Sequence, residues 1–156
     1  MNSTYTGILM LLGLVGMQLV FRYIKQARMK KWWGCAEGAC RAGDFPEAER
    51  ALRKCVSLMP LWVPARSLLG VVQAKQNKLS EAEEQLKMVA ELQPKEAEGF
   101  VELAAFYALF LPEQKADAID ALEKAVACDP DLREKLGDDV RLRALFEEED
   151  FKVLVG

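Results

Sequence analysis

The chain has 156 residues, of which 51% are apolar and 29% are charged, and its formal net charge is −3. This apolar fraction excludes an intrinsically disordered chain, and the negative charge argues against a nucleic-acid-binding protein. The sequence contains no histidine, which excludes catalysis, metal ligation and pH sensing by an imidazole group.

An apolar stretch followed by basic residues forms the N-terminal segment. Residues 1–31 hold five basic residues and no acidic one, so the remaining residues, 32–156, carry a net charge of −8. Within residues 5–24, the apolar run is interrupted only by Thr6, Gln18 and Arg22. Twenty helical residues span about 30 Å, which is the hydrocarbon thickness of a bilayer. The sequence therefore predicts an uncleaved transmembrane helix over residues 5–24.

Two alternatives to this anchor were weighed. A cleaved signal peptide is disfavoured because the charges follow the apolar run and because Phe21-Arg22-Tyr23-Ile24 offers no small-residue cleavage site. The other alternative is a buried helix within a soluble complex.

The position of the basic residues predicts the orientation of the anchor. All of them follow the span, so the positive-inside rule places the N-terminus outside and the rest of the chain in the cytoplasm, at a bacterial inner membrane or an organelle membrane. These residues either set the topology alone or also contact anionic lipid headgroups. We call them the basic collar: Arg22, Lys25, Arg28, Lys30 and Lys31. No glycine or proline lies between Gly16 and Gly34, which predicts one helix of about 35 residues or more that runs through the collar.

Prolines divide the following part of the chain into repeats. Pro60, Pro94 and Pro130 each follow a helical pattern, at intervals of 34 and 36 residues. Small residues recur at equivalent places, where they let two helices approach closely, and large residues follow them to fill the space beside the next unit. The small residues are Ala36, Gly70, Ala104, Ala48, Ala82 and Ala118, and the large ones are Leu52, Leu86 and Leu122. Gly43 predicts a tight turn, and Asp44 with Glu47 predicts a helix N-cap.

This pattern resembles the tetratricopeptide repeat family over three units, 29–62, 63–96 and 97–130, behind the anchor segment 1–28. The departures are Cys35, Arg66 and Gln73 at positions that are usually apolar, and two extra residues near Leu111-Pro112. The resemblance implies an all-α fold, a solenoid of three helix-turn-helix repeats. It also implies a scaffold that binds proteins in a concave groove lined by the first helix of each unit.

The C-terminal segment 131–156 differs from the repeats. A short helix over 131–136 is expected to end at Gly137, and a capping helix is expected from Asp138-Asp139 to about Glu148, with Leu142, Leu145 and Phe146 on its apolar face. The apolar tail 151–156 is expected either to pack back on the last repeat or to form a docking strand.

A helical wheel predicts which side chains face the groove. Lys/Asn/Arg clamps for chaperone tails occur in some family members, but the matching positions here hold residues such as Glu37, Glu98 and Glu102, so an acidic tail is disfavoured. An apolar or helical segment is the expected ligand, with Trp33 and Trp62 as anchors unless they lie at the membrane interface. The predicted groove residues are Trp33, Glu37, Arg41, Trp62, Val71, Lys75, Val101, Ala105 and Leu109.

The sequence offers little for catalysis. Cys35, Cys40, Cys55 and Cys128 have no metal-site spacing and are expected to be small core residues in a reducing compartment. We expect no enzyme activity, no metal, no cofactor, no small-molecule substrate and no nucleic acid partner. The preferred hypothesis is a membrane-anchored adaptor with a cytoplasmic repeat domain, and the alternative is an accessory or assembly subunit of a larger membrane protein complex.

Overall fold

The computed structural model describes residues 2–156, with the side chains of residue 10 and residues 13–156. All of its elements are helical: α1 (Asn2–Ala42), α2 (Phe45–Leu58), α3 (Val63–Lys75), α4 (Leu79–Leu92), α5 (Ala97–Phe110), the 3₁₀ helix η1 (Pro112–Gln114), α6 (Lys115–Cys128), α7 (Leu132–Leu136), the 3₁₀ helix η2 (Val140–Leu145) and α8 (Glu149–Val155).

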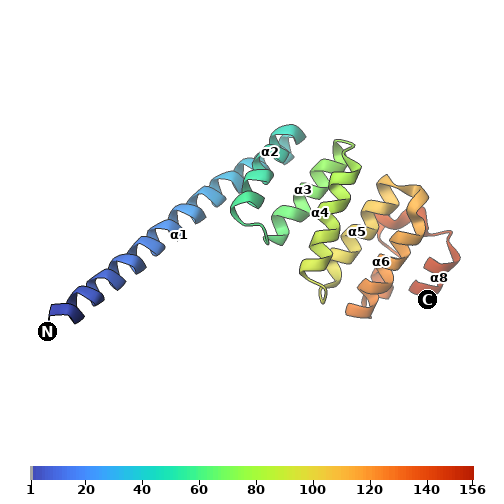
Figure 1. Cartoon of the computed structure of the whole chain (residues 1–156). Helices are drawn as coiled ribbons and strands as arrows, with labels where there is room; N and C mark the ends of the chain where they lie inside the picture. Colours follow the sequence, from blue (N-terminus) through green and yellow to red (C-terminus); the bar gives the residue numbers. More distant parts are fainter. Residues whose placement is uncertain (1) are drawn as a thin grey trace.

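Helix α1 is one unbroken helix of 41 residues, which confirms the prediction of a continuous helix through the collar. Its N-terminal half extends away from the other helices, and only its C-terminal part packs against α2 (Figure 1). Large apolar side chains on the extended half are therefore exposed. Among them, Met10 is 72% exposed, Met17 63% and Phe21 69%.

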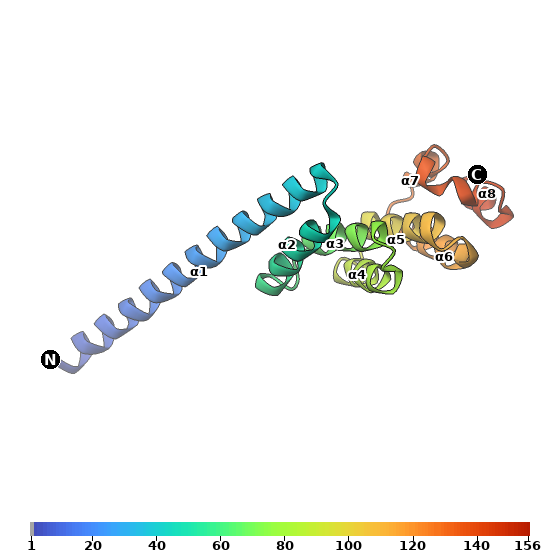
Figure 2. The same cartoon turned by 90° about the horizontal axis from the view of Figure 1, so that it is seen from above.

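Three antiparallel helix pairs, α1 with α2, α3 with α4 and α5 with α6, stack side by side in chain order, from left to right in Figures 1 and 2. This arrangement confirms the predicted helical solenoid. The expected large residues Leu52, Leu86 and Leu122 are at most 1% exposed. Leu52 shares a buried cluster with Leu69 of the second pair, whereas Leu122 shares one with Phe151 of the C-terminal segment. The expected small residues are all buried, because helix backbones approach closely there. A Cβ atom on Gly70 would lie 2.9 Å from Cγ of Leu86, so this approach between α3 and α4 requires glycine.

Within each of the first two helix pairs, an equivalent turn connects the first helix to the second. Gly43 and Asn77 lie 34 residues apart and have positive φ angles of 73° and 61°. The backbone N–H of Glu47 donates to Oδ1 of Asp44 at 3.1 Å, which confirms the predicted N-cap of α2. The turn in the third pair is built differently, because η1 takes up the two extra residues near Leu111-Pro112.

A buried carboxylate ties the first two repeats together. Oε2 of Glu49 accepts from Nζ of Lys78 at 2.6 Å and from Nε2 of Gln76 at 2.9 Å, while Oε1 accepts from Nη2 of Arg53 at 2.8 Å. Gln73, which replaces an apolar residue of the repeat pattern, donates to Glu81 at 3.0 Å within the same cluster. Burial alone would raise the pKa of Glu49, but the hydrogen bonds from Lys78, Arg53, Gln76 and Gln73 lower it to about 2. Glu49 is therefore a buried anion at neutral pH.

The C-terminal segment differs from the prediction in two ways. The expected capping helix up to Glu148 is instead the 3₁₀ helix η2 followed by α8, although Leu142 and Leu145 are fully buried as expected. The tail is a helix, so a docking strand is wrong. It packs back on the body: Phe151 is 2% exposed and stacks on Phe146 with ring centroids 5.6 Å apart. Asp139 caps the N-terminus of η2, because its carboxylate accepts a hydrogen bond from the backbone N–H of Arg141 at 3.0 Å.

In the part of the chain that the structure describes, no helix is long and apolar enough to cross a membrane. The predicted span over residues 5–24 lies partly outside the described part of the chain, because the structure does not describe the side chains of residues 5–9, 11 and 12.

Candidate functional site

The first helices of the three pairs line one face of the stack, and two adjoining clefts open on it. The first cleft, of about 500 Å³, is lined from three helices by Trp33, Ser67, Leu68, Val71, Glu98 and Glu102, with Val63, Pro64, Val89, Gln93 and Gly99 at its walls. The second, of about 240 Å³, is lined by Val71, Ala74, Lys75, Leu86, Glu102, Ala105, Phe106, Leu109, Phe110 and Arg141. Val71 and Glu102 belong to both clefts, so the two form one continuous surface, which we call the inner face.

An aromatic pair forms the N-terminal end of the inner face. The rings of Trp33 on α1 and Trp62, which precedes α3, lie with centroids 4.7 Å apart and planes tilted by 52°. Both side chains are half-buried. Each ring fixes the orientation of the other, so Trp33 presents a rigid apolar wall to the first cleft.

Charges of opposite sign occupy the two ends of the inner face. Glu98 lines the first cleft but not the second, whereas Glu102, which accepts a hydrogen bond from Oγ of Ser67, lies where the two clefts meet. Lys75 and Arg141 line the second. Nη2 of Arg141 lies 2.6 Å from Oδ2 of Asp139, and this hydrogen bond lowers the pKa of the Asp139 carboxyl group. The inner face thus offers apolar walls between an acidic end and a basic end, an arrangement suited to holding an apolar segment in one direction.

The structure brings some of the predicted groove residues together. Trp33 and Val71 line the first cleft, and Trp62 supports Trp33 from behind. Val71, Lys75, Ala105 and Leu109 all line the second cleft. Val71 and Leu109 are 38% and 54% exposed, which makes them accessible to a ligand.

Other predicted groove residues lie elsewhere. Glu37 and Arg41 are exposed on α1 and line neither cleft. Val101 lines neither of these clefts; it lines a third one with Leu132 and Cys128, where α6 meets α7. The helical wheel grouped Val101 with Ala105 and Leu109, although Val101 lines a different cleft from the other two.

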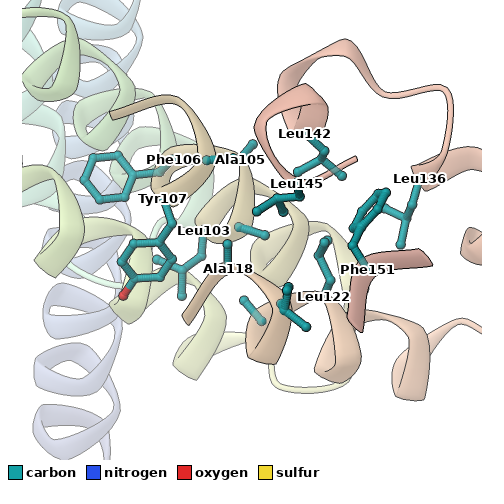
Figure 3. Close-up of a cluster of buried hydrophobic side chains, with 14 of the residues drawn as sticks. Leu103, Ala105, Phe106, Tyr107, Ala118, Leu122, Leu136, Leu142, Leu145 and Phe151 are labelled. Carbon is teal, nitrogen blue, oxygen red and sulfur yellow. The ribbon is translucent and has the colours of Figure 1, made fainter. Parts of the chain in front are cut away.

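The chain itself covers the third repeat of the predicted groove. Helix η2 packs on α5, and Figure 3 shows Leu142 and Leu145 directed toward α5 beside Ala105. As a result Ala105 is only 4% exposed and Ala108 only 5%. The accessible part of the inner face on α5 is therefore smaller than predicted, although Leu109 remains 54% exposed.

Several inner-face residues were missed by the sequence analysis. Phe106 and Phe110 line the second cleft although the helical wheel did not include them in the groove, and Arg141 reaches the same cleft from η2. The sequence carries no local signal for Arg141, since its place depends on how the C-terminal segment folds back.

The basic collar and the cysteines also have definite positions. Arg22, Arg28, Lys30 and Lys31 are exposed and Lys25 is half-buried. All four cysteines are free, but the expectation that they are core residues holds only for Cys55, because Cys35 is exposed and Cys40 and Cys128 are intermediate. Burial raises the pKa of the Cys55 and Cys40 thiols, so both are protonated at neutral pH.

Comparisons with known proteins agree with this architecture. A family model described as tetratricopeptide repeat matches residues 39–101. No curated protein sequence matches the chain.

Solved structures match over a larger part of the chain. An O-GlcNAc transferase mutant from Thermobaculum terrenum is 25% identical over 78% of this chain, with a TM-score of 0.62, and the chain spans only 22% of that protein. The MamA protein is 25% identical over 81% of this chain and 69% of its own length, with a TM-score of 0.62. The TPR2B domain of yeast Sti1, in its complex with pHsp70, is 15% identical over 75% of this chain and 94% of its own length, with a TM-score of 0.60.

The 34-residue spacing of Gly43 and Asn77, the stacked antiparallel helix pairs and the family match all describe one architecture. Such arrays serve as scaffolds for protein–protein interaction. The helical array of this chain is similar to the tetratricopeptide repeat family, whose model matches residues 39–101.

Proposed function

We propose that the chain is a membrane-anchored adaptor that holds a partner protein at the membrane surface through the inner face of its repeat domain. In this proposal α1 spans the bilayer with residues 5–24, the N-terminus lies outside, and the repeats lie in the cytoplasm. The adaptor performs no catalysis and needs no cofactor.

The exposed apolar half of α1 supports the anchor. The side chains of residue 10 and residues 13–24 are exposed around the helix rather than along one stripe, which is the pattern of a helix surrounded by lipid. The basic collar follows this stretch directly and would lie in the headgroup layer. Replacing Val15, which is 52% exposed, by arginine places a charge in the predicted span. Val15→Arg should release the chain from membranes during carbonate extraction, whereas Lys30→Arg should not.

The inner face supports the binding role. Its apolar walls at Trp33, Leu68 and Val71 fit an apolar or amphipathic helical segment of a partner. Glu98 and Glu102 in the first cleft would repel an acidic peptide tail, which is the ligand of repeat domains that carry a Lys/Asn/Arg clamp.

The single observation that carries this role is the position of Val71, which lines both clefts and remains 38% exposed. Val71→Asp should abolish recovery of a partner that copurifies with the full chain from membranes. Val153→Asp is the matched control, because Val153 is 76% exposed at the other end of the molecule. Equal recovery of the partner with both variants would refute binding at the inner face.

An accessory subunit of a larger membrane complex is the second candidate, and one observation favours it. Nothing lies within 4 Å of a Cβ atom built on Gly13 or Gly16, so the glycine surface of α1 is open to another membrane helix. Gly13→Leu and Gly16→Leu should then dissociate a complex that migrates as one species in mild detergent, while Val71→Asp leaves it intact.

A further inference from the structure

The loop between α2 and α3, Met59–Trp62, carries apolar side chains that the rest of the chain leaves exposed. Leu61 is 73% exposed and Met59 is 36% exposed. The loop is nevertheless held in place, because the ring of Trp62 packs against that of Trp33 and the carbonyl oxygen of Pro60 accepts a hydrogen bond from Nε of Arg66 at 2.5 Å. Leu61 is thus an apolar side chain fixed in an outward position.

This loop lies at the end of the repeat stack that faces the N-terminal half of α1. Helix α2 runs antiparallel to α1, so its last turn points back toward the predicted span, and both views show the loop on that side (Figures 1 and 2). The contact with Trp33 fixes its level along α1. Trp33 follows the collar residue Arg28 by five residues, which corresponds to about 7.5 Å of helix. Tilts of about 20° are usual for membrane helices, and a tilt toward the loop would bring Leu61 to the headgroup layer.

The sequence on both sides of the loop is basic. From Arg50 to Ser80 it contains six basic residues and no acidic residue: Arg50, Arg53, Lys54, Arg66, Lys75 and Lys78. Arg50, Arg53 and Lys78 form ion pairs with glutamates outside this stretch, so they do not add free positive charge beside the loop. Lys54 is exposed beside the loop, and the collar adds positive charge on α1. A second copy of this surface would be repelled by Lys54 and the collar, whereas anionic lipid attracts them. Tryptophan and leucine beside basic residues are the composition of a surface that inserts at a lipid interface.

We propose that the Met59–Trp62 loop docks the first repeat onto the anionic bilayer surface from which α1 emerges. This proposal rests on the anchoring of α1 proposed above. Docking would hold the repeat domain against the membrane at two points, the collar and the loop, and so fix the direction in which the inner face opens.

Photo-crosslinking of the full chain in vesicles tests the docking and the anchor separately. A photo-reactive benzoylphenylalanine replaces Leu61, Val15 or Val153, and the vesicles contain phosphatidylcholine alone or mixed equally with phosphatidylglycerol. We expect the Val15 position to capture lipid in both vesicles, the Leu61 position to capture several-fold more in the mixed vesicles, and the Val153 position to capture almost none.

The outcomes distinguish the two proposals. Capture at Val15 with none at Leu61 overturns docking and leaves the anchor standing. Absence of capture at Val15 overturns the anchor, and lipid capture at Leu61 alone would then support docking without a span. Capture of protein rather than lipid at Leu61 overturns lipid docking in favour of a protein contact.

Intrinsic fluorescence gives a second test without a crosslinker. All three tryptophans of the chain, Trp32, Trp33 and Trp62, lie in the first repeat, so brominated lipid should quench the fluorescence of docked protein. Leu61→Glu should lose most of this quenching, and Val153→Glu should retain it. Both positions are exposed, and a circular dichroism spectrum checks that each variant keeps its helices. Equal quenching of the two variants would overturn the proposal.

Discussion

The carboxylate of Glu49 on α2 lies 2.6 Å from the ammonium group of Lys78, which directly precedes α4, so one buried ion pair spans the junction between the first and second repeats. The Glu49 side chain is 7% exposed, whereas that of Lys78 is 40% exposed. This asymmetry means that the anion depends on its partners for solvation, while the cation can still reach water.

Removal of this carboxylate should destabilise the junction. Glu49→Ala leaves Lys78 without its carboxylate partner and removes the shortest hydrogen bond of Gln76, and it should lower the free energy of unfolding by about 1–3 kcal/mol. Urea denaturation of the detergent-solubilised chain measures the change. Glu84→Ala is the control, since Glu84 is exposed on α4 and should change stability by less than about 0.5 kcal/mol. Equal midpoints for both variants would contradict the structural role of Glu49.

The lowered pKa of Glu49 predicts a specific acid sensitivity. A carboxyl group whose pKa falls from 4.5 to about 2 on folding contributes stability that is complete above pH 4.5 and is lost as the pH falls toward 2. The loss attributable to Glu49 should approach about 3 kcal/mol. Glu49→Gln removes this titration, so the variant should lose less stability than the wild type between pH 7 and pH 3. Parallel pH profiles would argue against the buried anion.

Two glycines of the first helices should respond oppositely to alanine. Gly70→Ala places a Cβ atom 2.9 Å from Leu86 and 3.3 Å from the carbonyl oxygen of Ala82, and should destabilise the chain by about 1–3 kcal/mol. Gly38→Ala meets nothing within 4 Å and should stabilise α1 by about 0.5–1 kcal/mol. Thermal midpoints measured side by side check the difference in sign.

The equivalent turns predict which residues Gly43 tolerates. Its φ of 73° is unfavourable for a residue with a Cβ atom, so Gly43→Ala should cost about 1–2 kcal/mol. Asparagine adopts this conformation more readily, as Asn77 does in the next repeat with a φ of 61°. Gly43→Asn should therefore cost clearly less than Gly43→Ala in the same denaturation experiment. A larger cost for asparagine would show that the turn is constrained by something other than φ.

The C-terminal helix should be necessary for the stability of the last repeat. Phe151 is 2% exposed and packs in the cluster with Leu136 and Leu122 (Figure 3), so Phe151→Ala should cost about 3–5 kcal/mol. Val153→Ala, two residues away on the exposed side of α8, should have little effect. Limited proteolysis followed by mass spectrometry will show whether cleavage begins in α6 to α8 of the Phe151→Ala variant.

The repeat architecture could be predicted because its signals are local and periodic. Pro60 and Pro94 mark helix ends, and the small residues Ala36 and Gly70 recur at the period of the unit, so each signal supports the others. The C-terminal cap was harder to predict. A short apolar run such as 151–156 is compatible with either a strand or a helix, and its partners decide between them.

The candidate site was predicted less completely, since it depends on contacts between distant parts of the chain. The helical wheel identified Val71 and Leu109, but it carried no information on η2, which covers Ala105. It also gave no indication of the Glu49 cluster, whose partners Gln73 and Lys78 lie 24 and 29 residues further along the chain.

The unbroken course of α1 from Asn2 to Ala42 has a mechanical consequence. Because the helix has no break, its two halves rotate together. Contacts that fix the first half of α1 therefore also fix the rotation of the first repeat about the helix axis. Each residue between the held part and Trp33 contributes about 100° of rotation and about 1.5 Å of rise. The direction in which the Trp33–Trp62 pair faces therefore depends on the number of residues between Trp33 and the part of α1 that is held. Inserting one residue there would rotate the pair by about 100°.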